Sequence, residues 1–131
     1  MSALSLIGHD GVDDIEDRFY TWLTMNEVTR EYFTGRDIAK IQRGLRPIII
    51  LVLTDPDSID LDRLSAQLAI IHSRVRHAVT GEPIDAAAWD VTGRLLIHSL
   101  GVEFAPFEAH DQVLELATKV YSSLRPAIVQ A

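Results

Sequence analysis

The chain has 131 residues, 47% of them hydrophobic, which is enough for one domain with a core, and its formal net charge is −7. This acidity argues against duplex DNA, RNA or an anionic membrane as the main partner, because each of them needs a basic surface. The sequence has no cysteine, which excludes a disulfide scaffold, thiolate-bound zinc, an iron–sulfur cluster and a cysteine nucleophile.

Targeting and membrane signals are not evident in the sequence. The first residues, Met1 to Gly8, lack the basic segment that opens a secretory signal. The strongest apolar run, Ile48–Leu53, is far shorter than the roughly 20 residues of a membrane span. We therefore expect a soluble cytoplasmic protein with a single domain over residues 1–131, which binds neither nucleic acid nor membrane.

Apolar residues follow the period of an α-helix over most of the chain. The first stripe consists of Val12, Ile15, Phe19 and Leu23. A short segment runs from Asn26 to Gly35, and the next stripe consists of Ile38, Ile41, Leu45, Ile48 and Val52. Pro47 lies inside this second helix, where we expect a kink because proline removes one backbone hydrogen bond. The run Ile48–Leu53 also fits a buried strand, although the sequence offers no evident strand partner.

The second half of the chain predicts three further helices. Residues 54–60 form a turn, with Asp60 as the N-cap of a helix whose stripe is Leu61, Leu64, Leu68, Ile71 and Val75. We expect this helix to fray before Thr80. Asp85 caps the next helix, which ends at Gly101 and turns Trp89, Leu95, Leu96 and Leu100 inward. The last helix carries Val113, Leu116, Val120 and Leu124 and stops near Pro126. The pattern predicts an all-α domain, arranged either as a compact crossing fold or as an up-down bundle.

His72 is the first candidate for a chemical role. On a helix that turns about 100° per residue, it lies roughly 70° from the centre of the preceding stripe, at the edge of the buried face, where an imidazole can face a pocket. His77 lies roughly 150° from that centre, on the solvent side. A boundary histidine that is hydrogen-bonded to a backbone carbonyl is the alternative interpretation of His72.

Aromatic side chains are concentrated within one short stretch, and they are Phe19, Tyr20, Trp22, Tyr32 and Phe33. They form either ordinary core packing or a flat apolar wall with a phenol hydroxyl available as a hydrogen-bond donor. The acidic run Asp55, Asp57, Asp60 and Asp62 lacks the glycine and glutamate of an EF-hand, so we interpret it as turn residues and helix caps. A hydrolase or nucleotide-binding enzyme is poorly supported, because the chain has neither a nucleophile elbow nor a phosphate-binding loop after a strand.

The pair Phe19-Tyr20, followed by Tyr32-Phe33-Thr34-Gly35, resembles the bacterial truncated hemoglobins. That family has a Phe-Tyr pair on its second helix, a Phe-Phe-x-Gly-like segment before the distal helix, and a proximal histidine that ends a short helical stretch. Ile7-Gly8 and Gly11 stand where a shortened first helix would meet the second. The resemblance covers nearly the whole chain, and it implies a truncated globin-like helical fold that encloses a heme pocket.

The resemblance implies heme b (iron protoporphyrin) as the cofactor, with His72 as the proximal iron ligand through Nε2 and His77 as the alternative. Tyr20 would donate a hydrogen bond to the bound gas, and Phe33 would pack on the porphyrin. The other cofactor-binding residues would be Ile41 and Leu45 over the iron, Leu68, and Arg36 and Lys40, which would pair with the heme propionates.

The resemblance implies a protein that binds dioxygen, carbon monoxide and nitric oxide, for oxygen binding or for nitric oxide detoxification. Nitric oxide dioxygenase activity would need an external electron donor, because the sequence shows no flavin or nicotinamide module, and enzyme status stays open. Two alternatives remain: a globin-type sensor domain, and a heme-free helical interaction module.

Overall fold

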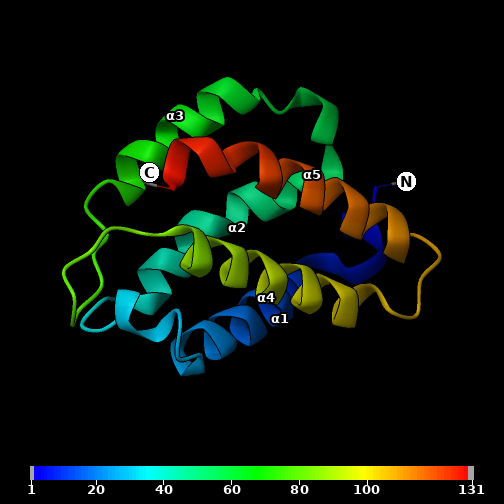
Figure 1. Ribbon diagram of the computed structural model, residues 1–131. Coiled ribbons are helices and arrows are strands. Elements are labelled where there is room, and N and C mark those ends of the chain that lie inside the picture. Colours follow the sequence, from blue (N-terminus) through cyan, green and yellow to red (C-terminus); the bar gives the residue numbers. More distant parts are fainter. Residues whose placement is uncertain (1, 130–131) are drawn as a thin grey trace.

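The computed structural model describes residues 2–129, which fold into five α-helices and two short 3₁₀ turns (Figure 1). The elements are α1 (Leu4–Met25), η1 (Arg30–Tyr32), α2 (Ile38–Thr54), η2 (Pro56–Ser58), α3 (Leu61–His72), α4 (Ala86–Phe104) and α5 (His110–Ile128). Within these residues, extended pairing is limited to one isolated bridge between Arg76 and Pro83. The expected all-α class is confirmed.

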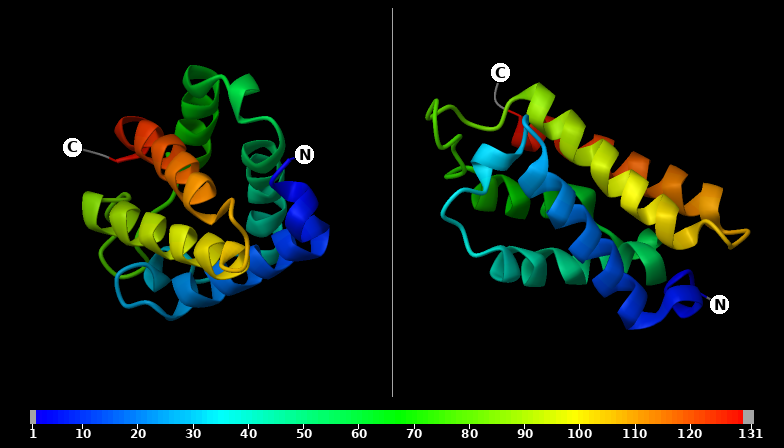
Figure 2. Two further views of the ribbon diagram at one scale, coloured as in Figure 1. Left: turned by 90° about the vertical axis from the view of Figure 1, so that its right-hand side faces the viewer. Right: turned by 90° about the horizontal axis from the view of Figure 1, so that it is seen from below.

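The helices pack in crossing pairs. Figure 1 shows α4 and α5 side by side and antiparallel, joined by the short connection at residues 105–109, with α1 below α4. The most extensive packing joins α1 to α4 and α3 to α5, followed by α4 with α5 and α1 with α2. The right-hand view in Figure 2 shows α1 and α4 strongly inclined to α2, so the helices form a crossing fold and not a parallel-sided bundle.

Aspartate caps open three of the helices. The side chains of Asp37, Asp60 and Asp85 accept hydrogen bonds from the backbone N–H three residues later, at 3.2, 3.0 and 2.8 Å. Each bond satisfies one backbone donor that the first helical turn leaves unpaired. The expected N-caps Asp60 and Asp85 are therefore confirmed.

The first helix bends at Gly8, where the backbone has φ 68° and ψ −178° within the span of α1. A side chain is unfavourable in this left-handed region, so glycine is suited to the bend. A short helical piece before Gly8 thus joins the longer piece that carries Phe19 and Tyr20.

The expected second helix is confirmed, because Ile48–Leu53 is helical and not a strand and α2 includes Pro47. Other expected helix boundaries differ from the structure. The helix α3 ends at His72, before Val75. The next helix does not end at Gly101, because it continues to Phe104, whose complete burial outweighs the helix penalty of a glycine, about 1 kcal/mol. The last helix likewise passes Pro126, and its final turn holds the buried Ile128.

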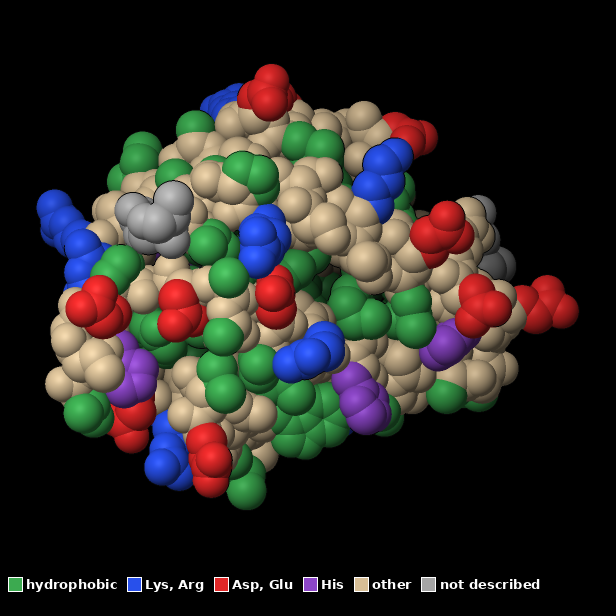
Figure 3. All heavy atoms as spheres, in the orientation of Figure 1, with side chains coloured by type: hydrophobic (Ala, Val, Ile, Leu, Met, Phe, Trp, Pro, Cys, Tyr) green, Lys and Arg blue, Asp and Glu red, His purple; other side chains and the backbone are tan. Residues whose placement is uncertain are grey.

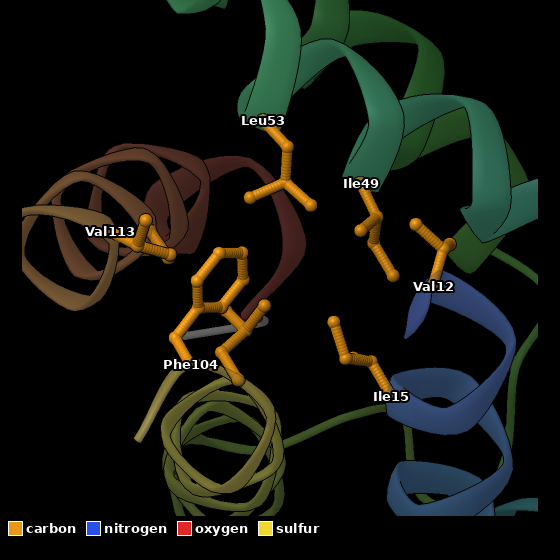
Figure 4. Close-up of a cluster of buried hydrophobic side chains, with 8 residues drawn as sticks. Val12, Ile15, Ile49, Leu53, Phe104 and Val113 are labelled. Atoms are coloured by element: carbon orange, nitrogen blue, oxygen red, sulfur yellow. The ribbon is translucent and has the colours of Figure 1, made fainter. Parts of the chain in front are cut away.

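The main core lies at the end of the molecule where α1, α2, α4 and α5 meet. Figure 4 shows the side chains that converge there, and the labelled ones are Val12, Ile15, Ile49, Leu53, Phe104 and Val113. Three of these, Val12, Ile15 and Phe104, have no exposed surface. The helix α3 contributes no fully buried residue. Its residues Leu64 and Leu68 pack against a separate buried cluster formed by Trp89, Leu124 and Ile128.

The surface mixes both signs of charge, and Figure 3 shows acidic and basic side chains interspersed with exposed hydrophobic ones. Two isoleucines at the end of α3, Ile70 and Ile71, are 74% and 65% exposed. No helix within residues 2–129 combines the length and the apolar character that crossing a bilayer requires.

Candidate functional site

An apolar cavity of about 190 Å³, here called the inner cavity, lies between the helices on the side of α3. Its walls come from all five helices and from the segment after η1. The lining residues are Phe19, Tyr20, Leu23, Phe33, Ile41, Leu45, Ile48, Ile49, Val52, Leu53, Leu68, His72, Trp89, Thr92, Leu96, Leu100, Ala117, Val120, Tyr121 and Leu124. None of these side chains carries a carboxylate.

A second cavity of about 170 Å³, the outer cavity, adjoins the first toward η1 and the 73–85 loop. The residues shared by the two cavities are Phe33, Ile41, His72, Trp89 and Thr92. The outer cavity is also lined by Arg36, the one charged side chain in either lining. Together the two volumes reach the lower end of the range of about 300–1,000 Å³ that ligand pockets occupy.

His72 stands at the junction of the two cavities, on the last turn of α3. Its Nδ1 lies 2.7 Å from the carbonyl oxygen of Leu68. A carbonyl oxygen only accepts, so Nδ1 carries a proton in this contact. Within residues 2–129, Nε2 makes no hydrogen bond. A backbone bond of this kind fits both a boundary histidine and a metal ligand.

His77 lies outside both linings, in the loop after α3. Its Nδ1 accepts hydrogen bonds from the backbone N–H groups of Val79 and Thr80, at 3.2 and 3.1 Å, and its ring meets the Tyr32 ring edge-on. These contacts hold the loop against η1, together with a backbone bond from Ala78 to the Glu31 carbonyl. The structure thus gives His77 a role in the loop and places His72 at the cavities.

Tyr20 reaches the inner cavity from α1 and is buried against Phe19 and Phe33, with ring centroids 5.0 and 6.2 Å away. No hydrogen bond of its hydroxyl is found within residues 2–129. Burial, and after it the negative charge of Glu16, raises the pKa of this phenol above its ordinary value. Tyr20 therefore stays protonated and remains a hydrogen-bond donor at neutral pH.

Most of the residues expected from the sequence come together at this site. The inner cavity is lined by Tyr20, Phe33, Ile41, Leu45, Leu68 and His72. Arg36 lies at the outer cavity. Lys40 is exposed on the first turn of α2 and lines neither cavity, so the structure separates it from the others.

The sequence interpretation missed the aromatic pair on the opposite wall. Trp89 on α4 stacks on Tyr121 of α5 with centroids 4.2 Å apart and planes 9° apart, and it meets the His72 ring edge-on at 6.4 Å. Tyr121 approaches so closely because Gly93 has no side chain, since a Cβ there would lie 2.4 Å from Tyr121 Cε1. The sequence signal for this close contact was that Gly93 follows Trp89 by one helical turn.

Glu16 and Arg46 form a buried charged contact behind Tyr20. Glu16 is 4% exposed, its Oε1 lies 3.8 Å from Arg46 Nη1, and its Oε2 has no partner within residues 2–129. Arg46 also pairs with Asp13, so it links α1 to α2. Burial raises the pKa of Glu16 to about 7, although Arg46 opposes the shift. The contact lies between α1, which carries Tyr20, and α2, which carries Ile41.

A wider groove runs between α4 and α5 on the face drawn in Figure 3, and its volume is about 720 Å³. Its lining includes Arg94, His98 and His110, and it lies open to solvent. An open groove removes little of a small ligand from water, whereas sites that bind small molecules enclose most of their surface. The inner and outer cavities are therefore the better candidate site.

Neither a protein family model, nor a curated protein sequence, nor a solved structure matches this chain. Its function is inferred below from the cavities and the side chains around them.

Proposed function

We propose that the protein is a heme-binding globin of the truncated type, which binds dioxygen and other diatomic gases at an iron atom ligated by His72. The observation that carries the proposal is the state of His72. Its Nδ1 lies 2.7 Å from the Leu68 carbonyl oxygen, its Nε2 makes no hydrogen bond within residues 2–129, and the residue lines both apolar cavities. An imidazole oriented by a backbone carbonyl is the usual form of a histidine that binds a metal.

The residues around His72 are compatible with heme. Apolar and aromatic side chains make up most of both linings, so a porphyrin ring would be buried against groups such as Phe33 and Trp89. The buried Trp89 Nε1–H has no acceptor within residues 2–129, and a ligand that carries oxygen atoms would supply one. Heme, when bound, supplies a ferrous iron that takes a diatomic gas as a ligand.

Tyr20, Ile41 and Leu45 would form the distal wall of this pocket. The protonated Tyr20 hydroxyl would donate a hydrogen bond to the gas ligand, which stabilises dioxygen more than carbon monoxide because dioxygen gains more negative charge on binding. The side chains of Ile41 and Leu45 would keep water away from the same space. Arg36 and the more distant Lys40 would offer positive charge to the propionates from the rim.

The assignment is tested by titrating the purified protein with heme. We expect stoichiometric uptake with a Soret band, and a shift of that band when the reduced protein is exposed to carbon monoxide. Tyr20→Phe removes one charge-assisted hydrogen bond, worth about 1.5–3 kcal/mol, so dioxygen should dissociate roughly tenfold faster or more. Absence of heme uptake by the wild-type protein would refute the proposed function.

The exposed apolar residues at the end of α3 and in the loop after it favour a second candidate, a heme-free interaction module. Ile70, Ile71 and Val79 are 74%, 65% and 77% exposed, and large exposed apolar side chains gather at contact surfaces. The same titration separates the two functions, because an interaction module would bind no heme.

A further inference from the structure

The indole of Trp89 is the polar group of the site that the proposed function leaves least explained. Its Nε1–H is buried and has no hydrogen-bond partner within residues 2–129. The indole nitrogen is a donor only, so a second donor does not satisfy it. A buried donor without an acceptor costs free energy that a well-placed ligand atom restores. We therefore expect a bound ligand to place a hydrogen-bond acceptor beside Trp89.

The positive charge of Arg36 indicates which kind of hydrogen-bond acceptor fits best beside Trp89. Arg36 lines the outer cavity together with Trp89, and its guanidinium makes no hydrogen bond or ion pair within residues 2–129. No aspartate or glutamate lines either cavity. Two donors, one of them cationic, thus share a cavity that contains no negative charge. An anionic oxygen acceptor complements this arrangement, and a carboxylate accepts from both donors at once.

We propose that Trp89 is a specificity-determining residue whose indole N–H, together with Arg36, binds a carboxylate of the ligand in the outer cavity. The inference rests on the proposed function and deepens it, because it selects porphyrins that carry free propionates over esterified ones. The inner cavity then takes the apolar part of the ring. Trp89 lines both cavities, and its stacking on Tyr121 holds the indole at their boundary. Lys40, which lines neither cavity, contributes little.

The test uses iron-free protoporphyrin IX and its dimethyl ester, so that His72 ligation plays no part. The chain has two tryptophans, and Trp22→Phe leaves Trp89 as the only one, whose fluorescence reports binding. Trp22 is a suitable position to change, because it meets His98 edge-on away from both cavities. We expect the free acid to quench Trp89 and to bind roughly tenfold more tightly than the ester.

A second variant, Trp89→Phe, tests whether the indole N–H causes the preference for the free acid. Its porphyrin binding is measured from the porphyrin absorbance. Phenylalanine keeps an aromatic ring against Tyr121 but removes the N–H. The variant should lose affinity for the free acid and little for the ester, so that the preference for the acid shrinks about threefold or more. Arg36→Gln, an exposed change that leaves folding intact, should shrink the same ratio, whereas Lys40→Gln should leave it unchanged.

The outcomes separate this inference from the function on which it rests. Acid and ester that bind the wild-type protein equally well, or an acid preference that Trp89→Phe leaves unchanged, overturn the role of Trp89 while heme binding stands. A wild-type protein that binds neither porphyrin nor heme overturns both. A reduced preference in Trp89→Phe and Arg36→Gln, with an unchanged one in Lys40→Gln, supports the carboxylate site.

Discussion

The two ends of the molecule use similar apolar stripes for different purposes. At the core end, side chains from α1, α2, α4 and α5 interlock, and Val12, Ile15 and Phe104 are completely buried. On the side of α3, the helix has no fully buried residue and borders two cavities. Because interiors are normally close-packed, unfilled space beside an apolar stripe is the kind of place where the proposed function puts a ligand. The core end maintains the fold, and the α3 side is available for a ligand.

The largest expected effect comes from opening a cavity at the core end. Phe104→Ala should lower the free energy of unfolding by about 3–5 kcal/mol, because Phe104 is completely buried and its neighbours cannot close the gap. Ile71→Ala on the α3 side should change it by less than about 0.5 kcal/mol. Urea denaturation of the ligand-free protein measures both, and similar losses for the two variants would contradict the difference between the regions.

A substitution at Gly93 tests the boundary between the core end and the α3 side. A Cβ at Gly93 would lie 2.4 Å from Tyr121 Cε1, so Gly93→Ala should cost about 1–3 kcal/mol and disturb the stack of Tyr121 on Trp89. The matched control is Gly44→Ala on α2, where no atom lies within 4 Å of the new Cβ and the helix should gain about 0.5–1 kcal/mol. Thermal unfolding distinguishes them, and a harmless Gly93→Ala would show that this close approach is not required.

Glu16, which lies behind Tyr20, makes the free energy of unfolding depend on pH. Its folded-state pKa of about 7 exceeds the ordinary value of 4.5, so the folded protein binds the proton more tightly and loses stability as pH rises between these values. Glu16→Gln cannot ionise, and it should be more stable than the wild-type protein by about 1–2 kcal/mol at pH 8, with little difference at pH 4.5. The control is Asp13→Asn, since Asp13 also pairs with Arg46 but is half exposed. A stability advantage of Glu16→Gln that does not grow with pH would contradict the assignment.

Filling the inner cavity should have a small effect on folding and a large effect on binding. Leu68→Phe places a larger ring in space that the ligand-free protein leaves open, so the free energy of unfolding should change by less than about 1.5 kcal/mol. The same variant should bind porphyrin at least about tenfold more weakly, because the ring competes for that space. Unfolding and titration on one preparation give both numbers, and unchanged porphyrin affinity would remove Leu68 from the site.

The helices and several site residues were predictable because they follow local rules. Period and caps located all five helices, and the Phe19-Tyr20 and Tyr32-Phe33 segments pointed to residues that the structure brings to one cavity. The missed features depend on contacts between distant parts of the chain. Phe104 extends its helix through burial in the core, and Trp89 reaches His72 only because the fold places their rings 6.4 Å apart at the cavity.

The alternative interpretation of His72 also needed the structure. Helical geometry placed His72 at the edge of the buried face and left two roles open, a boundary histidine and a metal ligand. The hydrogen bond to Leu68 is common to both roles, so it does not decide between them. The structure adds that His72 lines two apolar cavities, which follows from tertiary packing, and the proposed function rests on this placement.

The central claim, that His72 binds the iron of a bound heme, is tested most directly by comparing His72→Ala with His77→Ala after heme titration. We expect His72→Ala to lose the absorption spectrum of histidine-ligated ferrous heme and to recover it when imidazole is added, while His77→Ala keeps the wild-type spectrum. An unchanged spectrum in His72→Ala, or its loss in His77→Ala alone, would contradict the claim.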